Sequence, residues 1–328
     1  MSRRAVITGI TGQDGSYLAE LLLDKGYEVH GVVRRVALEN PEYHFRRITD
    51  IRDRLKLHAA TLENLASLQK VFMEVEPNEC YHLAAQSFVS YSFEDEFSTM
   101  QTNIDGTHYI LSALKDLTPD CRFYFAGSSE MIGVAKEIPQ SESTPFHPRS
   151  AYGISKTAAY YLTQHYREAY DIHASSGILF NHESPRRGHE FVTRKISSYA
   201  AKIKLGLCSE LRLGNLDARR DWGHSRDYVK AMWDMLQQDT PDDYVIASGK
   251  SHSVEEFCEM AFSTLDMDYK RYIVIDEALF RPAEIYDLAG DASKAKRVLN
   301  WEPNISFSDL VKEMVFSDLE IYGHEVSK

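Results

Sequence analysis

The chain has 328 residues and carries 37 Lys and Arg against 49 Asp and Glu, a formal net charge of −12. This charge excludes non-specific nucleic-acid binding as the main role, because such binding requires a clustered positive field. The hydrophobic share of 43% is typical of a globular protein, and no stretch approaches the ~18 apolar residues that span a bilayer. We therefore expect a globular protein that has neither nucleic acid nor a membrane as a partner.

The N-terminus runs from Met1-Ser2-Arg3-Arg4 directly into an apolar, β-branched segment. Because it lacks the apolar region of a signal peptide, we expect a cytoplasmic protein. The four cysteines are scattered without a CxxC pair, which argues against a zinc site and a disulfide framework. The spacing of the histidines likewise suggests no metal site.

Short apolar runs alternate with helical patterns in the first half of the chain. We predict strands at residues 5–8, 29–33, 55–59, 79–83 and 122–126, and helices at 16–25, 62–75 and 97–114. Strands that alternate with helices indicate βαβ units and a parallel sheet. The predicted fold class is therefore α/β, a Rossmann-type doubly wound parallel sheet.

The alternation loosens after about Asn181, where prolines separate mixed short elements, with helical patterns at 191–205 and 226–238. We interpret residues 1–180 as a nucleotide-binding domain to which later segments return. Residues 181–328 would form mainly a smaller, discontinuous substrate lobe.

A glycine-rich loop, Gly9-Ile-Thr-Gly12-Gln-Asp-Gly15, joins the first predicted strand to the first predicted helix. Glycines permit a tight turn and let a pyrophosphate approach the backbone, and the helix N-terminus adds unpaired N–H groups. The spacing is one residue longer than the usual dinucleotide fingerprint. The order of strand, loop and helix nevertheless favours a dinucleotide-binding loop over an ordinary glycine turn.

Arg34 and Arg35 follow the second predicted strand, where the adenosine ribose of a dinucleotide binds. An acid there would bind the 2′-hydroxyl of NAD, whereas arginines suit a 2′-phosphate. The pair therefore favours NADP, with a surface arginine pair as the alternative.

Tyr152 and Lys156 lie four residues apart, a spacing that places both side chains on one face of a helix. Of the 19 tyrosines, only this one has lysine four positions later. A nearby ammonium and a nicotinamide cation would favour the phenolate and lower the tyrosine pKa. The pair would then act as the base that deprotonates an alcohol as hydride leaves its carbon.

Ser128, Ser129 and Glu130 follow the fifth predicted strand, at the sheet edge where ligands bind in open parallel sheets. The Ser128 hydroxyl could hydrogen-bond the substrate alcohol. Simple alcohol oxidation needs no carboxylate, so Glu130 indicates removal of a proton next to a newly made ketone. A helix-capping or salt-bridged surface acid is the alternative for Glu130.

With these residues in place, the chain resembles the extended short-chain dehydrogenase/reductases and, more narrowly, is similar to the GDP-mannose 4,6-dehydratases. The similarity runs nearly end to end. It rests on residues 8–20, 34–35, 83–87 (LAAQS), 128–130, 144–150, 152–156, 179–188 (LFNHESPRRG), 191–195, 220–223 and 281–284. The match at 179–188 is highly specific, whereas the glycine loop and the Tyr-Lys pair fit any member of the superfamily.

The resemblance implies site residues position by position. As catalytic residues it implies Ser128, Glu130, Tyr152 and Lys156. As NADP contacts it implies Gly9, Gly12, Gln13, Asp14, Gly15, Arg34, Arg35, Leu83, Ala85, Ser87, Tyr152, Lys156, His182 and Arg187. Around the nucleotide sugar it implies Ser87, Ser128, Glu130, Asn181, Lys195, Arg220, Arg281 and Glu284, and no metal.

The chain departs from the family pattern at several places. The segment 36–51 is short and unusual, and in the family this loop contacts NADP and helps to build a tetramer. Ala59-Ala60 occupies the position at which the family commonly has an aspartate that contacts the adenine of the cofactor. Gly127 and Met131-Ile132 replace more usual residues around the catalytic acid. These changes bear on cofactor contacts, assembly and the sugar more than on the reaction type.

The implied activity is NADP-dependent dehydration of GDP-mannose to GDP-4-keto-6-deoxymannose by internal hydride transfer from C4 to C6, a lyase (hydro-lyase) reaction. Two alternatives are enzymes: the same reaction on GDP-manno-heptose, and a GDP-4-keto-6-deoxy-sugar reductase. A third is a regulator that binds NADP or a nucleotide sugar without turnover. The resemblance also implies a homodimer or homotetramer, because in this superfamily the helix that carries Tyr152 commonly packs against its twin.

Overall fold

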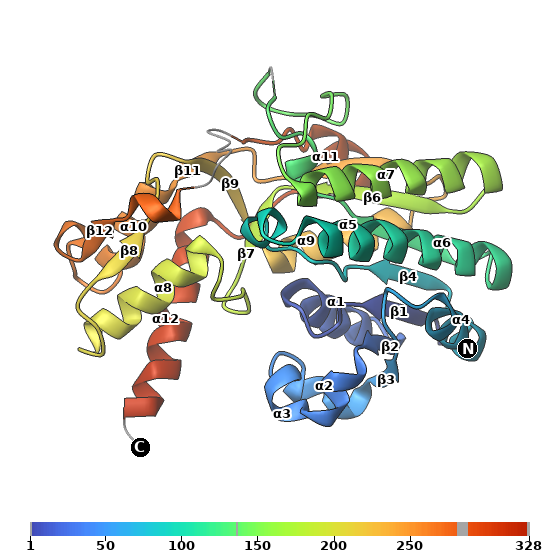
Figure 1. Cartoon of the computed structure of the whole chain (residues 1–328), viewed down its shortest axis with the longest axis horizontal. Helices are drawn as coiled ribbons and strands as arrows, with labels where there is room; N and C mark the ends of the chain where they lie inside the picture. Colours follow the sequence, from blue (N-terminus) through green and yellow to red (C-terminus); the bar gives the residue numbers. More distant parts are fainter. Residues whose placement is uncertain (1, 136, 281–287, 327–328) are drawn as a thin grey trace.

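The computed structural model describes residues 2–135, 137–280 and 288–326. Within them, seven parallel strands form the main sheet (Figure 1). Their spatial order is β10 (Asp243–Ile246), β6 (Ala174–Leu179), β5 (Arg122–Ala126), β4 (Glu79–His82), β1 (Arg4–Thr8), β2 (Glu28–Val33) and β3 (Lys56–Ala59). The chain thus moves outward from β1 in both directions, which is the doubly wound arrangement, and the predicted fold class is confirmed.

Helices cover both faces of this sheet. One face carries α1 (Gln13–Asp24), α9 (Ser225–Leu236) and α11 (Ser293–Leu299), and the other carries α4 (Leu65–Val75), α6 (Gly106–Leu117) and α7 (Ala151–Tyr170). Alternate residues of β1 divide between the two layers: Ala5 and Ile7 pack toward α1, and Val6 packs toward α4. Because successive side chains point to opposite faces and helices cover both faces, every position of such a strand is buried and its sequence is a continuous apolar run.

The predicted helices differ from the observed ones mainly at their ends. The first begins at Gln13 rather than Ser16, and the helix predicted at 62–75 begins at Leu65, where Asn64 accepts a hydrogen bond from Ser67 N at 3.0 Å. The segment predicted as one helix at 97–114 consists of α5 (Glu96–Met100), a π-helical turn η3 (Gln101–Asp105) and α6.

The segment between β2 and β3 has no long helix. It contains α2 (Arg35–Glu39), α3 (Pro41–His44) and the 3-10 helix η1 (Thr49–Arg54). Further short turns are η2 (Ser90–Phe93), η4 (Ser129–Met131), η5 (Tyr269–Arg271) and η6 (Glu277–Leu279).

A smaller lobe lies to the left in Figure 1 and has its own core. It contains the helices α8 (Val192–Lys204), α10 (Val254–Ser263) and α12 (Phe307–Val326). It also contains a sheet of β11 (Ser251–Ser253), β9 (Arg219–His224) and β7 (Asn181–Glu183), and a pair of β12 (Ile273–Ile275) and β8 (Leu211–Leu213). The helices predicted at 191–205 and 226–238 correspond to α8 and α9.

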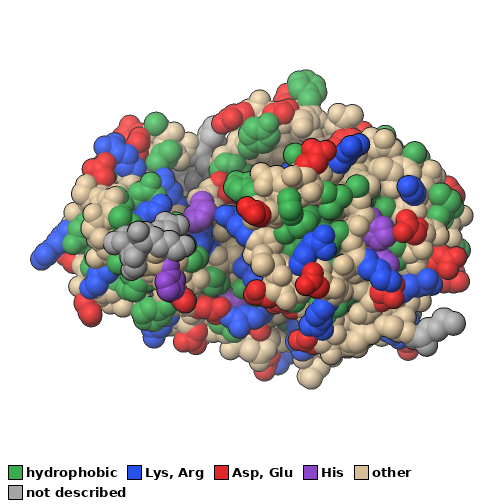
Figure 2. Space-filling model, turned by 90° about the horizontal axis from the view of Figure 1, so that it is seen from below, with side chains coloured by type: hydrophobic (Ala, Val, Ile, Leu, Met, Phe, Trp, Pro, Cys, Tyr) green, Lys and Arg blue, Asp and Glu red, His purple; other side chains and the backbone are tan. Residues whose placement is uncertain are grey.

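The surface in Figure 2 mixes acidic and basic side chains, with hydrophobic ones in small groups between them. No helix of the described residues has the length and apolar character needed to cross a membrane.

Candidate active site

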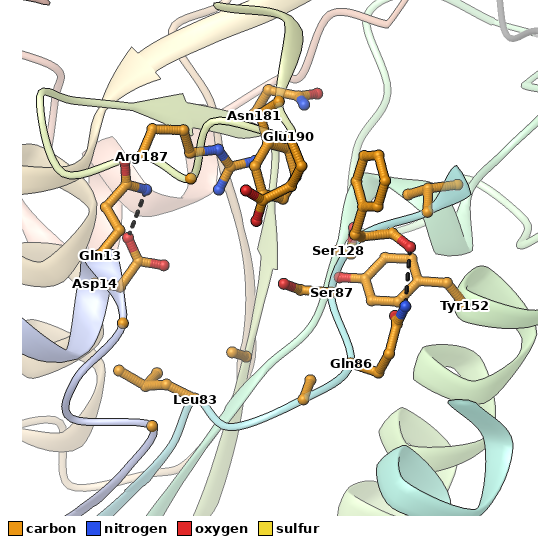
Figure 3. Close-up of a pocket in the computed structure, with 18 of the residues that line it drawn as sticks. Gln13, Asp14, Leu83, Gln86, Ser87, Ser128, Tyr152, Asn181, Arg187 and Glu190 are labelled. Atoms are coloured by element: carbon orange, nitrogen blue, oxygen red, sulfur yellow. Dashed lines mark hydrogen bonds between the residues drawn. The ribbon is translucent and has the colours of Figure 1, made fainter. Parts of the chain in front are cut away.

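A cavity of about 880 Å³ lies at the carboxyl ends of the central strands, between the main sheet and the smaller lobe. In Figure 3, Gln13, Asp14 and Arg187 lie on one side of it, and Ser87, Ser128 and Tyr152 lie on the other. Ligands bind at this edge in open parallel sheets, because the strand order reverses there and leaves a crevice.

The first two turns of α7 carry Tyr152 and Lys156 on the face that lines the cavity. Ser150 begins the helix, since its Oγ accepts a hydrogen bond from Gly153 N at 3.0 Å. Lys156 is 4% exposed, and its Nζ donates to Ala126 O, at the end of β5, at 2.8 Å. The helix cap and this bond together fix the pair over the sheet edge.

In the protein alone the pKa of Tyr152 is raised, whereas the lowered pKa expected from the sequence also depends on a nicotinamide cation and stays a prediction. Burial raises the pKa of Tyr152 to about 12, and a hydrogen bond with Ser128 opposes that rise only in part. Burial also lowers the pKa of Lys156 to about 8. Lys156 Nζ lies 6.0 Å from the Tyr152 ring centroid, and burial is the largest influence on the pKa of both groups. A positive charge brought by a ligand would favour the phenolate and lower this pKa.

Glu130 lies in the wall of the same cavity and is 9% exposed. It belongs to η4, the turn that follows β5, and Ser128 caps this turn by accepting from Glu130 N at 3.2 Å. A surface role for this acid is therefore wrong: the carboxylate, the Ser128 hydroxyl and the Tyr152 phenol share one cavity.

The glycine loop leaves no room for side chains on its inner side. A Cβ at Gly15 would collide with Gly9 O and Ile10 Cα, and a Cβ at Gly9 would be 2.9 Å from Ala84 N. Gly9 also has a φ of +75°, which L side chains rarely adopt. The loop therefore packs directly on the segment after β4 and presents its backbone to the cavity.

An ion pair joins the glycine loop to the smaller lobe. His182 Nε2 lies 2.8 Å from Asp14 Oδ2, and Gln13 Nε2 donates to His182 O at 3.1 Å. Burial by itself would raise the pKa of Asp14 and lower that of His182. The attraction between the two charges and their hydrogen bond outweigh burial, so the pKa of Asp14 is lowered and that of His182 is raised.

Charged side chains of the smaller lobe complete the cavity wall. Arg187 Nε forms an ion pair with Glu183 at 3.0 Å, and its guanidinium lies 3.5 Å from the Phe191 ring centroid. Lys195 Nζ donates to Arg212 O at 2.7 Å, and burial lowers its pKa. Arg220 is 7% exposed and donates to Arg219 O at 2.7 Å.

Most of the site residues predicted from the sequence line this one cavity. They are Gly9, Gly12, Gln13, Asp14, Gly15, Arg34, Leu83, Ala85, Ser87, Ser128, Glu130, Tyr152, Lys156, Asn181, His182, Arg187, Lys195 and Arg220. Arg35 does not line it: the side chain is 87% exposed and forms an ion pair with Glu39 at 3.2 Å. Arg281 and Glu284 lie outside the described residues.

Several other residues of the site carry no pattern in the sequence that could have identified them. Arg47, Glu63, Gln86 and Glu190 line the cavity, and Asn103 in the π-helical turn supports it from behind. Asn103 Nδ2 donates to Gln86 O at 3.1 Å and to Ser155 Oγ at 2.9 Å. These residues meet only in the folded chain, so their sequence spacing carries no pattern. The described residues include no cluster of three or more side chains that could hold a metal ion.

Comparison with known proteins gives one consistent family. The family model described as GDP-mannose 4,6 dehydratase matches residues 6–314. GDP-mannose 4,6 dehydratase 2 of Arabidopsis thaliana is 51% identical over 333 residues, covering 98% of this chain and 88% of that protein. The human GDP-mannose 4,6 dehydratase is 48% identical, covering 97% of this chain and 91% of that protein.

Solved structures at lower identity share the fold. DesIV, a dTDP-glucose 4,6-dehydratase from Streptomyces venezuelae with NAD and TYD bound, has a TM-score of 0.85 at 22% identity and covers 98% of each chain. RMD from Pseudomonas aeruginosa complexed with NADPH has a TM-score of 0.81 at 24% identity, covering 98% of this chain and 100% of that one. These structures share the fold over nearly the whole chain, and the family model and the sequence matches show that the chain belongs to the GDP-mannose 4,6-dehydratase family.

Proposed function

We propose that this chain is an NADP-dependent hydro-lyase that converts GDP-mannose to GDP-4-keto-6-deoxymannose. The observation that carries the proposal is the placement of Glu130: a buried carboxylate shares one cavity with Tyr152 and Lys156. A dehydrogenase needs only a phenol and an ammonium, whereas dehydration also needs an acid/base for the carbon next to the ketone. The family match over residues 6–314 supports the same reaction.

The cavity fits a dinucleotide cofactor. The glycines let the loop pack closely on its own backbone and on the segment after β4, so that its backbone lines the cavity, and Arg34 supplies a cation at the end of β2. We assign Gly9, Gly12, Gln13, Asp14, Gly15, Arg34, Leu83, Ala85, Ser87, Tyr152, Lys156, His182 and Arg187 to this cofactor. When bound, the nicotinamide ring would accept a hydride from C4 of the sugar and return it to C6.

The protein groups handle the protons of this reaction. Tyr152 removes the proton from the O4 hydroxyl, and Ser128 hydrogen-bonds both the phenol and that hydroxyl. Lys156 stabilises the Tyr152 phenolate together with the positive charge of the bound nicotinamide, and the two charges offset the unfavourable burial of the phenolate. Glu130 takes the C5 proton and helps the C6 hydroxyl to leave as water.

We assign Ser87, Asn181, Lys195 and Arg220, all of which line the cavity, to the nucleotide sugar, together with Arg281 and Glu284. The two arginines and the lysine suit a diphosphate, since guanidinium groups bind its oxygens with paired donors. Residues 1–180 would then bind mainly the cofactor, and residues 181–328 mainly the substrate.

The test is Glu130→Gln with GDP-mannose and NADP, followed by product identification by mass spectrometry. We expect loss of 4-keto-6-deoxy product by about 100-fold or more, because general acid/base groups contribute about 10² to 10⁴. Glu94→Gln, a change at an exposed acid that does not line the cavity, is the control and should leave the rate unchanged. Near wild-type product formation by Glu130→Gln would show that the assigned role is wrong.

Absorbance of NADPH, measured beside product identification, separates the enzymatic alternatives. A dehydratase shows no net change in NADPH absorbance, whereas a reductase acting on a GDP-4-keto-6-deoxy-sugar consumes NADPH stoichiometrically. Parallel incubation with GDP-manno-heptose identifies the preferred sugar. Tight binding of NADP without product from either sugar would indicate a regulator.

We also propose that two copies associate through α5 and α7. Phe97 is 81% exposed on α5, and Tyr161 is 55% exposed on α7, whereas their neighbour Tyr160 is buried. The two helices pack together, so the exposed rings belong to adjacent elements. Sedimentation velocity of Phe97→Lys should show monomers where the wild type shows dimers or tetramers.

A further inference from the structure

Arg47 lines the cavity, and the proposed reaction assigns no role to it. It lies between β2 and β3, in the segment where the chain departs from the pattern of its family. Its Nε donates to Arg186 O at 2.7 Å, and its Nη1 donates to Thr11 O at 3.3 Å. One side chain thus bridges the glycine loop and the loop that follows β7.

Both ends of this bridge are fixed. Next to Arg47 in the chain, Phe45 and Ile48 are 5% and 0% exposed in the core against α1. On the far side, Arg186 forms an ion pair with Glu20 of α1 at 2.6 Å and donates to Ser16 Oγ at 3.0 Å. The guanidinium is therefore held in place before any ligand arrives, which lowers the entropy cost of binding.

Among the described residues, Arg47 forms no ion pair with a carboxylate. Burial lowers its pKa to about 10, and the positive charge of Arg46 adds to this effect, which Glu190 opposes. A cation in such a place is unfavourable unless an anion reaches it.

We propose that Arg47 binds a phosphate group of the dinucleotide cofactor and, by bridging the two loops, keeps the cofactor bound from one turnover to the next. This inference rests on the proposed function. Two of the five guanidinium N–H donors are used by the carbonyls, and the others remain for a ligand in the cavity. Retention suits a reaction that returns its cofactor unchanged, because the cofactor need not leave between turnovers.

Either the pyrophosphate or the 2′-phosphate could be the group bound, and the same guanidinium chemistry serves both. Thr11 O places the side chain beside the glycine loop, and Arg34 lines the cavity at the end of β2. Comparison of NADPH with NADH, which lacks the 2′-phosphate, separates the two.

The experiment compares Arg47→Gln with Arg46→Gln in the full-length protein. Arg46 is the matched control: it carries the same charge in the same segment but is exposed and does not line the cavity. Binding and release of NADPH and NADH are followed by nucleotide fluorescence, and thermal melts check that each variant folds. Arg47→Lys, which keeps the charge without the planar fork, is the second variant.

We expect Arg47→Gln to weaken NADPH binding by about 10-fold to 100-fold, mainly through faster release. Arg46→Gln should stay within about 2-fold of the wild type, and Arg47→Lys should fall between the two. Equal weakening of NADH assigns the pyrophosphate, and weakening of NADPH alone assigns the 2′-phosphate.

The proposal is overturned if a folded Arg47→Gln binds both nucleotides like the wild type. It is also overturned if Arg46→Gln weakens binding to the same extent, because the effect would then come from the loss of any positive charge in this segment rather than from Arg47 itself. A wild-type protein that binds neither nucleotide would instead contradict the proposed function.

Discussion

Arg34 and Arg35 are adjacent in the sequence, but only Arg34 lines the cavity, while Arg35 forms an exposed ion pair with Glu39. Exposed ion pairs contribute little, so the two arginines should differ in function. We expect Arg34→Ala to raise the dissociation constant of NADPH by about 10-fold or more and that of NADH much less. Arg35→Ala should change neither constant. Isothermal titration of the four combinations checks this, and equal losses in both variants would contradict the assignment.

At the scale of elements, the π-helical turn η3 connects the cavity to the catalytic helix. Asn103, which is 2% exposed, accepts a hydrogen bond from Gln86 N at 2.9 Å and donates to Gln86 O and Ser155 Oγ. One side chain thereby fixes the segment that carries Ser87 against α7. Such π-helical turns are frequent at functional sites, since the extra residue redirects a side chain.

Asn103→Ala should therefore reduce both stability and activity. It leaves the partly buried backbone N–H and C=O of Gln86 and the buried Ser155 hydroxyl without this partner, so we expect a loss of about 2 to 4 kcal/mol in the free energy of unfolding. We expect kcat to fall even at temperatures where the variant is fully folded. Asn78→Ala is the control, because Asn78 accepts from Arg4 N at 2.8 Å at the opposite end of the sheet. That change should cost stability alone, and the same drop in kcat for both variants would argue against a positioning role of Asn103.

The sequence predicted those parts of the site whose chemistry is local. The glycine loop, the Tyr152-Lys156 pair and Glu130 each follow a predicted strand or lie one helical turn apart, so spacing reveals them. Arg47 and Asn103 depend on partners far along the chain, such as Arg186 and Ser155, and no period in the sequence reports such contacts. Burial raises the pKa of Tyr152 in the protein alone, and residue spacing does not report this effect because burial depends on the whole fold.

At the scale of the whole molecule, the Asp14–His182 pair connects the glycine loop of the main sheet to β7 of the smaller lobe. His182 Nδ1 lies 2.7 Å from Phe180 O, and Nε2 faces Asp14, so both ring nitrogens donate to acceptors. The ring also stacks on Tyr228 at 4.5 Å between centroids. This environment favours the imidazolium and makes the contact between the lobes dependent on pH.

The direction of that dependence follows from the two pKa shifts. The folded pKa of His182 is raised above 6.5, so its contribution to stability is complete below pH 6.5 and is lost as pH rises through the raised value. The folded pKa of Asp14 is lowered below 3.8, so its contribution is lost only in strong acid. We expect His182→Gln to reduce the free energy of unfolding by about 1 to 2 kcal/mol near pH 6 and by much less near pH 9. Denaturant unfolding of both proteins at matched pH values measures this difference, in which the titration of other groups cancels. A difference that stays constant from acid to alkali would mean that the two lobes are held together there by packing on Tyr228 rather than by charge.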